Sequence, residues 1–257
     1  MNNNFEEKKE DLIFHFNEIY KRCGNSFHIG WGSYLFNGHN YEYDARMLQK
    51  QKLIFDLAKQ NQSVLEVGVY MGHSLLIMLL ANPKIKITCI DIESYYSLPA
   101  VEYLKENFKE AEINFIKGNS LNLLKNIKED FDLFHIDGSH SPFVIAKEIL
   151  LCLKIKQEKN IKILFDDIDF MKDIKKNILT IFKITKDVTP DCRGRNCYLE
   201  FSFNDKEIKS YKNYYRKYIR SNFIKRFLNF FYSIFFTNRI FVYIKRKYKI
   251  LINQKFG

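Results

Sequence analysis

The sequence predicts an α/β fold, namely a Rossmann-like, mostly parallel sheet of seven strands with helices on both faces. Apolar runs of strand length alternate with helix-like segments between residues 61 and 204, which is typical of consecutive strand–helix–strand units. Several runs are β-branched or aromatic without strict alternation, as in strands that are covered on both faces. These observations favour one core domain at residues 61–204. A helical cap with a lid loop (1–60) precedes it, and a basic, aromatic helical tail (205–257) follows it.

The cap is expected to contain two helices joined by a loop. Residues 5–22 and 43–60 carry apolar side chains at helical spacing. The loop between them is rich in glycine and aromatic residues. Trp31, Tyr34 and Phe36 can form a lid over a ligand crevice or anchor the loop in the core, and we favour the lid.

The core alternates regularly between the two kinds of element. The strands are expected at residues 63–68, 85–91, 112–117, 131–137, 161–166, 183–189 and 196–203. The helices between them are expected at residues 72–81, 98–109, 120–128, 142–156 and 168–182. Ligands of open α/β sheets bind at the carboxyl ends of the strands, so the residues that follow each strand form the candidate site.

The net charge of +11 comes from the tail. From Ile208 to Gly257 there are 13 Lys and Arg and no Asp or Glu, whereas the rest of the chain is close to neutral. The uncharged stretch from Phe227 to Asn238 is shorter than the ~20 residues that cross a bilayer. A basic, aromatic helix at residues 209–257 suits the surface of an anionic membrane, which we favour. It also suits packing against the core or a second subunit of a homo-oligomer, or RNA binding that salt weakens.

The opening of the chain and its cysteines predict a cytoplasmic protein. Met1 to Glu10 is polar and charged, unlike a secretory signal. Cys192 and Cys197 have no second Cys/His pair nearby, which argues against a structural zinc site. We therefore expect a cytoplasmic protein that the tail can hold peripherally at the inner face of the membrane.

The turn after the first strand predicts a cofactor site. Glu66, Gly68 and Gly72 form an E-x-G-x-x-x-G pattern. The glycines permit close approach of the backbone to a ligand and tight packing at the helix start. The N-terminus of the following helix presents free N–H groups to a ligand carboxylate. Tyr70 and Ser74 belong to the same turn and are further candidates for cofactor contact.

An acid after the second strand narrows the choice of cofactor. Asp91 is placed to accept hydrogen bonds from ribose hydroxyls, as acids do in dinucleotide sites. The turn lacks the G-x-G-x-x-G spacing of nicotinamide dinucleotide sites, and no G-x-x-x-x-G-K-[ST] loop for ATP occurs. The pattern favours S-adenosylmethionine (SAM), and a purely structural turn is the alternative.

Carboxylates follow the fourth and fifth strands. Asp137 lies in the segment His135-Ile-Asp-Gly-Ser-His140, and Asp166 and Asp167 end the next strand. Adjacent parallel strands lie about 4.8 Å apart, so carboxylates at their ends can bind one ion. Oxygen ligands without a nearby cysteine favour Mg²⁺. Alternatively, Asp166 and Asp167 cap the next helix and Asp137 forms a turn.

The histidines near these carboxylates include a candidate base. His140 can accept a proton near neutral pH, because an imidazole titrates in that range. Alternatively, His140 orients Asp137, and Asp137 itself takes the proton. His135 is expected to be structural, and His73 is expected only to touch the cofactor.

In these residues the chain resembles the class I SAM-dependent methyltransferases. The resemblance implies that the glycine turn holds the methionine part of SAM, that Asp91 holds the ribose, and that Asn119 and Ser120 lie beside the adenine. Many members carry an aspartate where this chain has Lys117-Gly-Asn-Ser120, which weakens the adenine assignment. The complete candidate cofactor set is Glu66, Gly68, Tyr70, Gly72, Ser74, Asp91, Asn119, Ser120 and Asp137.

Residues 61–170 are similar, more narrowly, to the macrocin-type sugar O-methyltransferases. Members of that branch carry I-D-G-x-H/Y and D-D segments that supply Mg²⁺ ligands. Asp137, Asp166 and Asp167 fall on those positions, and the resemblance implies that they bind Mg²⁺.

We therefore expect a SAM-dependent, Mg²⁺-assisted O-methyltransferase that acts on a hydroxyl of a sugar. The sugar, either nucleotide-activated or part of a surface polysaccharide, is implied by the resemblance alone. One competing hypothesis is an RNA methyltransferase that binds RNA through the tail, although the Asn/Asp-Pro-Pro-Tyr/Phe motif of enzymes that methylate amino groups of nucleic acids is absent. The other is a non-catalytic scaffold of the same fold.

Overall fold

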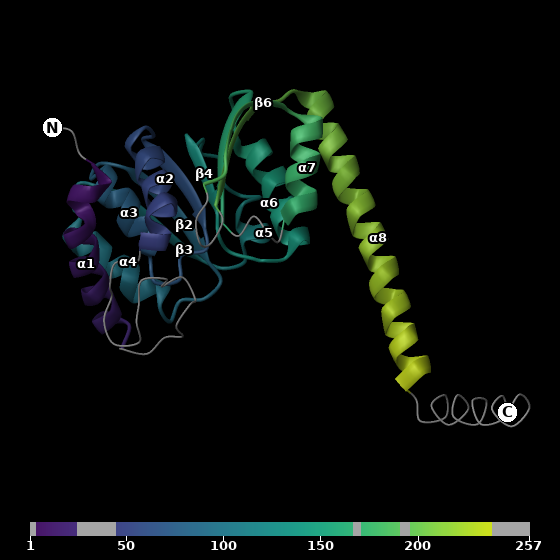
Figure 1. Cartoon of the computed structure of the whole chain (residues 1–257), viewed down its shortest axis with the longest axis horizontal. Coiled ribbons are helices and arrows are strands. Elements are labelled where there is room, and N and C mark those ends of the chain that lie inside the picture. Colours follow the sequence, from purple (N-terminus) through teal and green to yellow (C-terminus); the bar gives the residue numbers. More distant parts are fainter. Residues whose placement is uncertain (1–3, 25–44, 167–170, 191–195, 238–257) are drawn as a thin grey trace, which may run out of the picture. The chain divides into compact units, whose positions relative to one another are not determined.

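The structure is a computed structural model that describes residues 4–24, 45–166, 171–190 and 196–237 (Figure 1). The chain divides into two compact units, Met1–Tyr211 and Lys212–Gly257. The first unit contains the sheet, the helices around it and the candidate site. The described parts of the predicted cap belong to this same unit, so they pack with the core.

Within the described ranges, seven strands form one sheet, as the sequence predicts. The strands are β1 (Ser63–Val67), β2 (Lys86–Asp91), β3 (Glu112–Lys117), β4 (Leu133–Ile136), β5 (Asn160–Phe165), β6 (Lys183–Val188) and β7 (Cys197–Ser202). Their order across the sheet is β3-β2-β1-β4-β5-β7-β6. The pairs among β1 to β5 are parallel, whereas β7 runs antiparallel to both β5 and β6. The prediction of a mostly parallel sheet is confirmed.

The strand order reverses at β1. The chain moves outward from β1 to β2 and β3, and then returns to β4 on the other side of β1. Val67 at the end of β1 pairs with Ile90 of β2 and with Ile136 of β4. The turns that follow these strands are therefore neighbours. Doubly wound folds bind their ligands at such a reversal of strand order.

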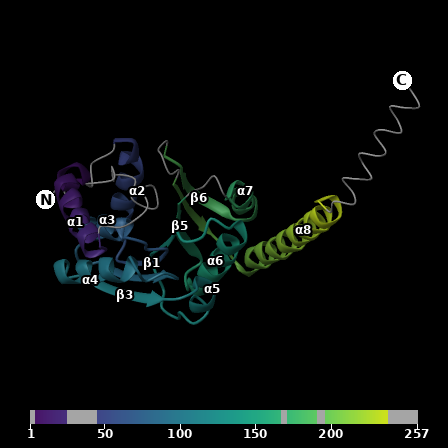
Figure 2. The same cartoon turned by 90° about the horizontal axis from the view of Figure 1, so that it is seen from below.

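The helices of the first unit pack in groups around the sheet (Figure 2). They are α1 (Lys9–Arg22), α2 (Leu48–Lys59), α3 (His73–Ala81), α4 (Ser97–Asn107), α5 (Ser120–Leu123), α6 (Pro142–Ile155) and α7 (Lys172–Ile181), with short 3-10 helices η1 (Phe5–Lys8) and η2 (Ala45–Met47). α1 packs on α3 and α4, α2 packs on α3, and α5 packs on α6. Every residue of α3 is buried, as expected for a helix that is apolar on nearly all sides.

One helix is shorter than predicted. The sequence predicts a helix at residues 120–128, but α5 ends at Leu123. Leu124 is buried, whereas residues 125–130 are polar apart from Ile127. A helix that cannot bury an apolar face is marginal in water, so the chain leaves the helix after one turn.

The second unit contains most of the tail. α8 (Asp205–Thr237) begins in the first unit, where Tyr211 is fully buried and its ring lies 5.6 Å from that of Phe182. The basic side chains of residues 212–221 are exposed. None of the described helices is long and apolar enough to cross a membrane. Binding of the tail to a membrane, RNA or a second subunit stays a prediction, and residues 238–257 lie outside the described part.

Candidate functional site

The strand ends predicted to carry the site line one cavity of about 1000 Å³. The predicted residues in its wall are Gly68, Tyr70, His73, Ser74, Asp91, Asn119, Ser120, Asp137, His140 and Asp166. Lys50 and Glu148, which the sequence pattern did not single out, line the cavity as well. The predictions that lie outside the described residues are those for Asp167 and for the lid residues Trp31, Tyr34 and Phe36.

The turn after β1 requires glycine at position 68. Gly68 has a φ of +92°, and a Cβ at this position would lie 2.3 Å from the carbonyl oxygen of Asp137. The loop after β4 therefore passes too close for any side chain. Gly72, the N-cap of α3, is not among the described wall residues. A Cβ there would lie 3.2 Å from Cδ1 of Leu104, so Gly72 permits tight packing at the helix start.

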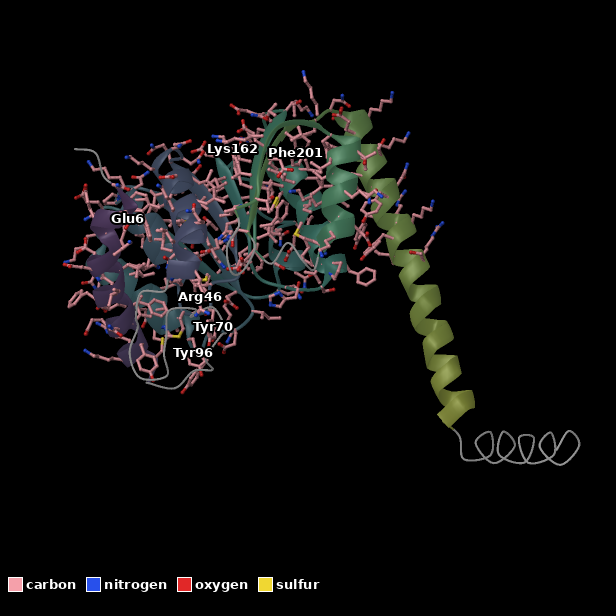
Figure 3. All side chains as sticks on the ribbon, viewed as in Figure 1. Glu6, Arg46, Tyr70, Tyr96, Lys162 and Phe201 are labelled. Carbon is pink, nitrogen blue, oxygen red and sulfur yellow. The ribbon has the colours of Figure 1, made fainter. Side chains whose placement is uncertain are left out.

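Asp91 holds the same turn in place. Its Oδ2 accepts hydrogen bonds from the backbone N–H groups of Val69 and Tyr70, both at 2.8 Å, and its Oδ1 accepts one from Glu93 at 2.9 Å. Tyr70 has a φ of +47°, a conformation that is unfavourable for residues other than glycine. The hydrogen bonds to Asp91 help to hold it there. The Tyr70 ring lies 5.3 Å from that of Tyr96, another wall residue (Figure 3).

Glu66 lies behind the cavity wall. It is fully buried, and its Oε1 accepts a hydrogen bond from the hydroxyl of Ser74 and lies 2.8 Å from Nδ1 of His135. Glu66 is not among the described residues that line the cavity, so its position favours a supporting role over the direct cofactor contact predicted for it. The contacts link β1 to β4 and to the start of α3. His135, which was expected to be structural, is buried in this network.

Glu148 is a wall residue that the sequence pattern did not indicate. It is fully buried, and its Oε1 accepts a hydrogen bond from the hydroxyl of Ser120 at 2.6 Å. Its Oε2 has no hydrogen-bond partner among the described residues. Burial raises the pKa of Glu148 above its ordinary value. Glu148 is the only acid of α6. A single acid in a mostly apolar helix was the one sign in the sequence that this residue could face the site. Nearby, Asn119 caps α5 by accepting from the N–H of Leu121.

Asp137 and Asp166 meet at the ends of β4 and β5, as the sequence predicts, and share a hydrogen bond. Burial raises the pKa of Asp137 well above its ordinary value, and the charge of Asp166 raises it further. Burial also acts to raise the pKa of Asp166. The Lys50 ammonium and the hydrogen bond from Asp137 outweigh that effect and lower the pKa of Asp166 below its ordinary value.

Asp166 is not the N-cap of α7, and residues 167–170, which follow it, lie outside the described part. α7 begins at Lys172, and its N-cap is Met171. Instead, the two oxygens of Asp166 accept hydrogen bonds from Nζ of Lys50 at 2.8 Å and 2.7 Å. Lys50 is on the same face of α2 as the buried residues Ile54 and Ala58, and this helical spacing was the only sign in the sequence that it faces inward.

The two histidines of the wall have different environments. His73 is buried at the start of α3, with its Nε2 3.2 Å from Nε2 of Gln51 and its ring against Phe16. Burial, and next the charge of Lys50, lowers the pKa of His73 to about 3. It is therefore neutral at ordinary pH. His140 is exposed, so it is open to a substrate in the cavity.

Replacing His73 with glutamine is expected to make the stability less dependent on pH. The folded pKa of about 3 lies below the unfolded value of about 6.5, so between these values only the unfolded chain takes up the proton. The stability that His73 contributes is complete above pH 6.5 and is lost as the pH falls towards 3. In urea unfolding, the wild type should lose about 2 kcal/mol more than His73→Gln between pH 7 and pH 5.

Lys52→Gln is the control for this comparison, because it changes an exposed residue of α2 and leaves every histidine in place. It should keep the pH dependence of the wild type. The same pH dependence in all three proteins would contradict a buried, neutral His73.

Both the sequence and the fold resemble known methyltransferases. Residues 65–168 match the family described as methyltransferase domain. The chain is 34% identical over 96 residues to a putative caffeoyl-CoA O-methyltransferase from Arabidopsis thaliana, which covers 36% of this chain and 41% of that protein. It is 31% identical over 97 residues to tapetum-specific methyltransferase 1 of the same plant, with coverage of 36% and 42%. The matches thus span about two fifths of the length of these curated relatives.

Several solved structures share the fold. The Podospora anserina methyltransferase PaMTH1, bound to S-adenosylhomocysteine (SAH), has a TM-score of 0.53 at 14% identity and covers 72% of this chain and 88% of its own. An O-methyltransferase from Bacillus cereus in complex with SAH has a TM-score of 0.53 at 12% identity, with coverage of 74% and 90%. TomG from Streptomyces achromogenes, in complex with SAM, has a TM-score of 0.50 at 16% identity, with coverage of 75% and 99%.

At these identities the structural likeness concerns the fold. The matched domain adds sequence evidence over the strands that form the site. The glycine turn and Asp91 lie where the strand order reverses, which is the position of a bound nucleotide in such sheets. Residues 65–168 therefore match a methyltransferase domain, and the chain is similar in sequence and fold to SAM-dependent methyltransferases.

Proposed function

We propose that this protein is a SAM-dependent O-methyltransferase that acts on a hydroxyl of a sugar, either nucleotide-activated or part of a surface polysaccharide. One observation carries the proposal. A single cavity joins the Gly68 turn and Asp91, which suit SAM, to Asp137 and His140, which suit the deprotonation of a hydroxyl. The O-methyltransferases among the similar proteins support oxygen as the acceptor atom. The choice of a sugar rests on the resemblance of residues 61–170 to the macrocin-type branch.

Several residues of the cavity wall fit SAM. Gly68 keeps the backbone of the turn free of a side chain. Oδ1 of Asp91, which accepts one hydrogen bond in the structure, can accept another from a ribose hydroxyl. Glu148 would accept a hydrogen bond from the adenine amine beside Asn119 and Ser120, because its buried Oε2 lacks a partner among the described residues. When bound, SAM supplies a methyl group on a sulfonium, already activated for transfer.

Other residues of the cavity wall fit the acceptor. His140 would take the proton of the hydroxyl, and Asp137 is the alternative base. The hydrogen bond to Asp166 fixes the position of Asp137. A volume of about 1000 Å³ is at the upper end of the range of ligand pockets. The cavity therefore has room for an acceptor beside the cofactor, and alignment of the two is the main task of the protein.

Magnesium does not fit this cluster as the structure describes it. The oxygens of Asp137 and Asp166 suit Mg²⁺ by type. Both Asp166 oxygens, however, are bonded to the Lys50 ammonium, and the described residues contain no group of three His, Cys, Asp or Glu that could hold an ion. The third predicted ligand, Asp167, lies outside that set. The proposed reaction therefore has no step that uses a metal.

Calorimetry and a methyl-transfer assay test the proposal together. One SAM should bind per chain, and a labelled methyl group should pass to a member of a panel of nucleotide-activated sugars. Transfer to caffeoyl-CoA alone would support O-methyltransferase activity and contradict a sugar as the acceptor. Transfer to RNA alone would support the competing hypothesis. Failure to bind SAM would contradict the whole proposal.

A further inference from the structure

A buried lysine from the cap lies in the acid cluster at the cavity wall. Nζ of Lys50, in α2, lies 2.8 Å and 2.7 Å from the two carboxylate oxygens of Asp166, at the end of β5. The two side chains are 5% and 6% exposed. Lysine is almost never buried this fully unless it is paired. Lys52 and Lys59 of the same helix are exposed, so the burial is specific to position 50.

A divalent ion would compete with this ammonium for the same oxygens. Mg²⁺ binds carboxylate oxygens at about 2.1 Å, and both oxygens of Asp166 already accept hydrogen bonds from Lys50. Two positive charges at one carboxylate repel each other strongly in a site with little water. Metal binding would therefore require that Lys50 leave its partner, and moving one member of a buried ion pair away from the other is costly.

The charge of Lys50 also acts on the second carboxyl of the cluster. Asp137 shares a hydrogen bond with Asp166 and interacts electrostatically with Lys50. All three side chains line the cavity, and so does His140. The lysine is therefore placed beside the residues proposed to bind and deprotonate the acceptor, where a positive charge is needed.

We propose that the Lys50 ammonium is the built-in cation of this site, in the position that a divalent metal ion would need at Asp137 and Asp166. This role stands on the contacts of Lys50, whereas its catalytic consequence rests on the proposed O-methyltransferase function. A fixed positive charge stabilises the negative charge that develops on the acceptor oxygen as its proton leaves. Because an ammonium does not chelate, the acceptor needs one hydroxyl and not a pair of adjacent oxygens.

Titration of the full chain with MgCl₂ in a calorimeter tests the proposal. The wild type should show no saturable Mg²⁺ binding, and EDTA should not change its melting temperature. Lys50→Met should acquire a saturable Mg²⁺ site, at least tenfold tighter than any in the wild type, because the two carboxylates lose their cation. Lys52→Met, with the same substitution at an exposed position of the same helix, should behave as the wild type.

Two results would overturn the proposal. One is a saturable Mg²⁺ site in the wild type that Asp166→Asn removes. The other is a folded Lys50→Met protein that binds Mg²⁺ no better than the wild type. If Lys50→Met does not fold, the titration of the wild type decides between the two outcomes. Lys50→Arg, which keeps the positive charge, should fold and should show no saturable Mg²⁺ binding.

Titrating SAM into the same preparations separates this inference from the proposed function. A wild type that binds neither SAM nor Mg²⁺ would contradict the proposed function, but it would still support Lys50 as the cation of the acid cluster. If the wild type transfers methyl groups, EDTA should leave the rate of transfer unchanged. A tenfold loss of this rate in EDTA that added Mg²⁺ restores would overturn the proposal. Lys50→Met should be at least tenfold slower, and added Mg²⁺ should restore part of that rate.

Discussion

Replacing Gly68 with alanine is expected to lower the free energy of unfolding by about 3 kcal/mol or more and to abolish SAM binding. The new Cβ would lie 2.3 Å from the carbonyl oxygen of Asp137, at a φ of +92°. A left-handed backbone costs an L side chain about 1–2 kcal/mol, and overpacking typically adds about 1–3 kcal/mol. To relieve the contact, the turn after β1 must move away from the loop after β4, which changes the cavity wall. Urea unfolding and calorimetry measure the two effects.

Gly24→Ala separates the backbone cost from the steric contact. Gly24 has a φ of +80°, but a Cβ there meets no described atom within 4 Å. We expect this variant to lose only about 1–2 kcal/mol and to bind SAM as the wild type does. Equal losses of stability in the two variants would contradict the close approach of the two loops.

Replacing Asp91 with alanine is expected to weaken SAM binding about 100-fold. Hydrogen bonds that involve a charged group contribute about 1.5–3 kcal/mol, and each 1.4 kcal/mol corresponds to a factor of about ten in affinity. The variant also removes the acceptor that holds the N–H groups of Val69 and Tyr70. Calorimetric titration with SAM measures the change. Asp56→Ala, at an exposed position of α2, is the matched control and should bind SAM normally.

A modified ligand separates ribose contact from support of the turn. The wild type should bind 2′-deoxy-SAH more weakly than SAH, because a ribose hydroxyl is missing. In Asp91→Ala the two ligands should bind almost equally, since their difference depends on the removed carboxylate. If the variant still discriminates as strongly as the wild type, Asp91 only supports the turn.

The fold class was predictable because its signals are local. Apolar runs separated by helical segments predict a mostly parallel sheet, and the seven-stranded sheet confirms it. Helix lengths were less predictable, because they depend on what each helix can pack against. The segment at residues 120–128 was predicted to be one helix, yet α5 ends at Leu123 and none of its residues is buried.

The site was predictable at the level of strand ends and less so at the level of single atoms. Gly68, Asp91, Asp137 and Asp166 line one cavity because the ends of parallel strands meet at one edge of the sheet. Glu66 belongs to the same sequence pattern but lies behind the wall, bonded to Ser74 and near His135. A strand residue points to one face or the other, and only its neighbours in space decide what it contacts.

The sequence by itself determined the order of strands and helices, the glycine turn and the acids at the strand ends, since each is a property of a short continuous segment. The tertiary structure alone decided which charges meet. Lys50 and Asp166 are 116 residues apart in the chain, and Ser120 and Glu148 are 28 apart. In sequence, only the isolation of Glu148 in its helix and the helical spacing of Lys50 indicate that these two charges are buried. Burial makes each of them need a partner, and the fold determines whether that partner is a carboxylate, a hydroxyl or a ligand.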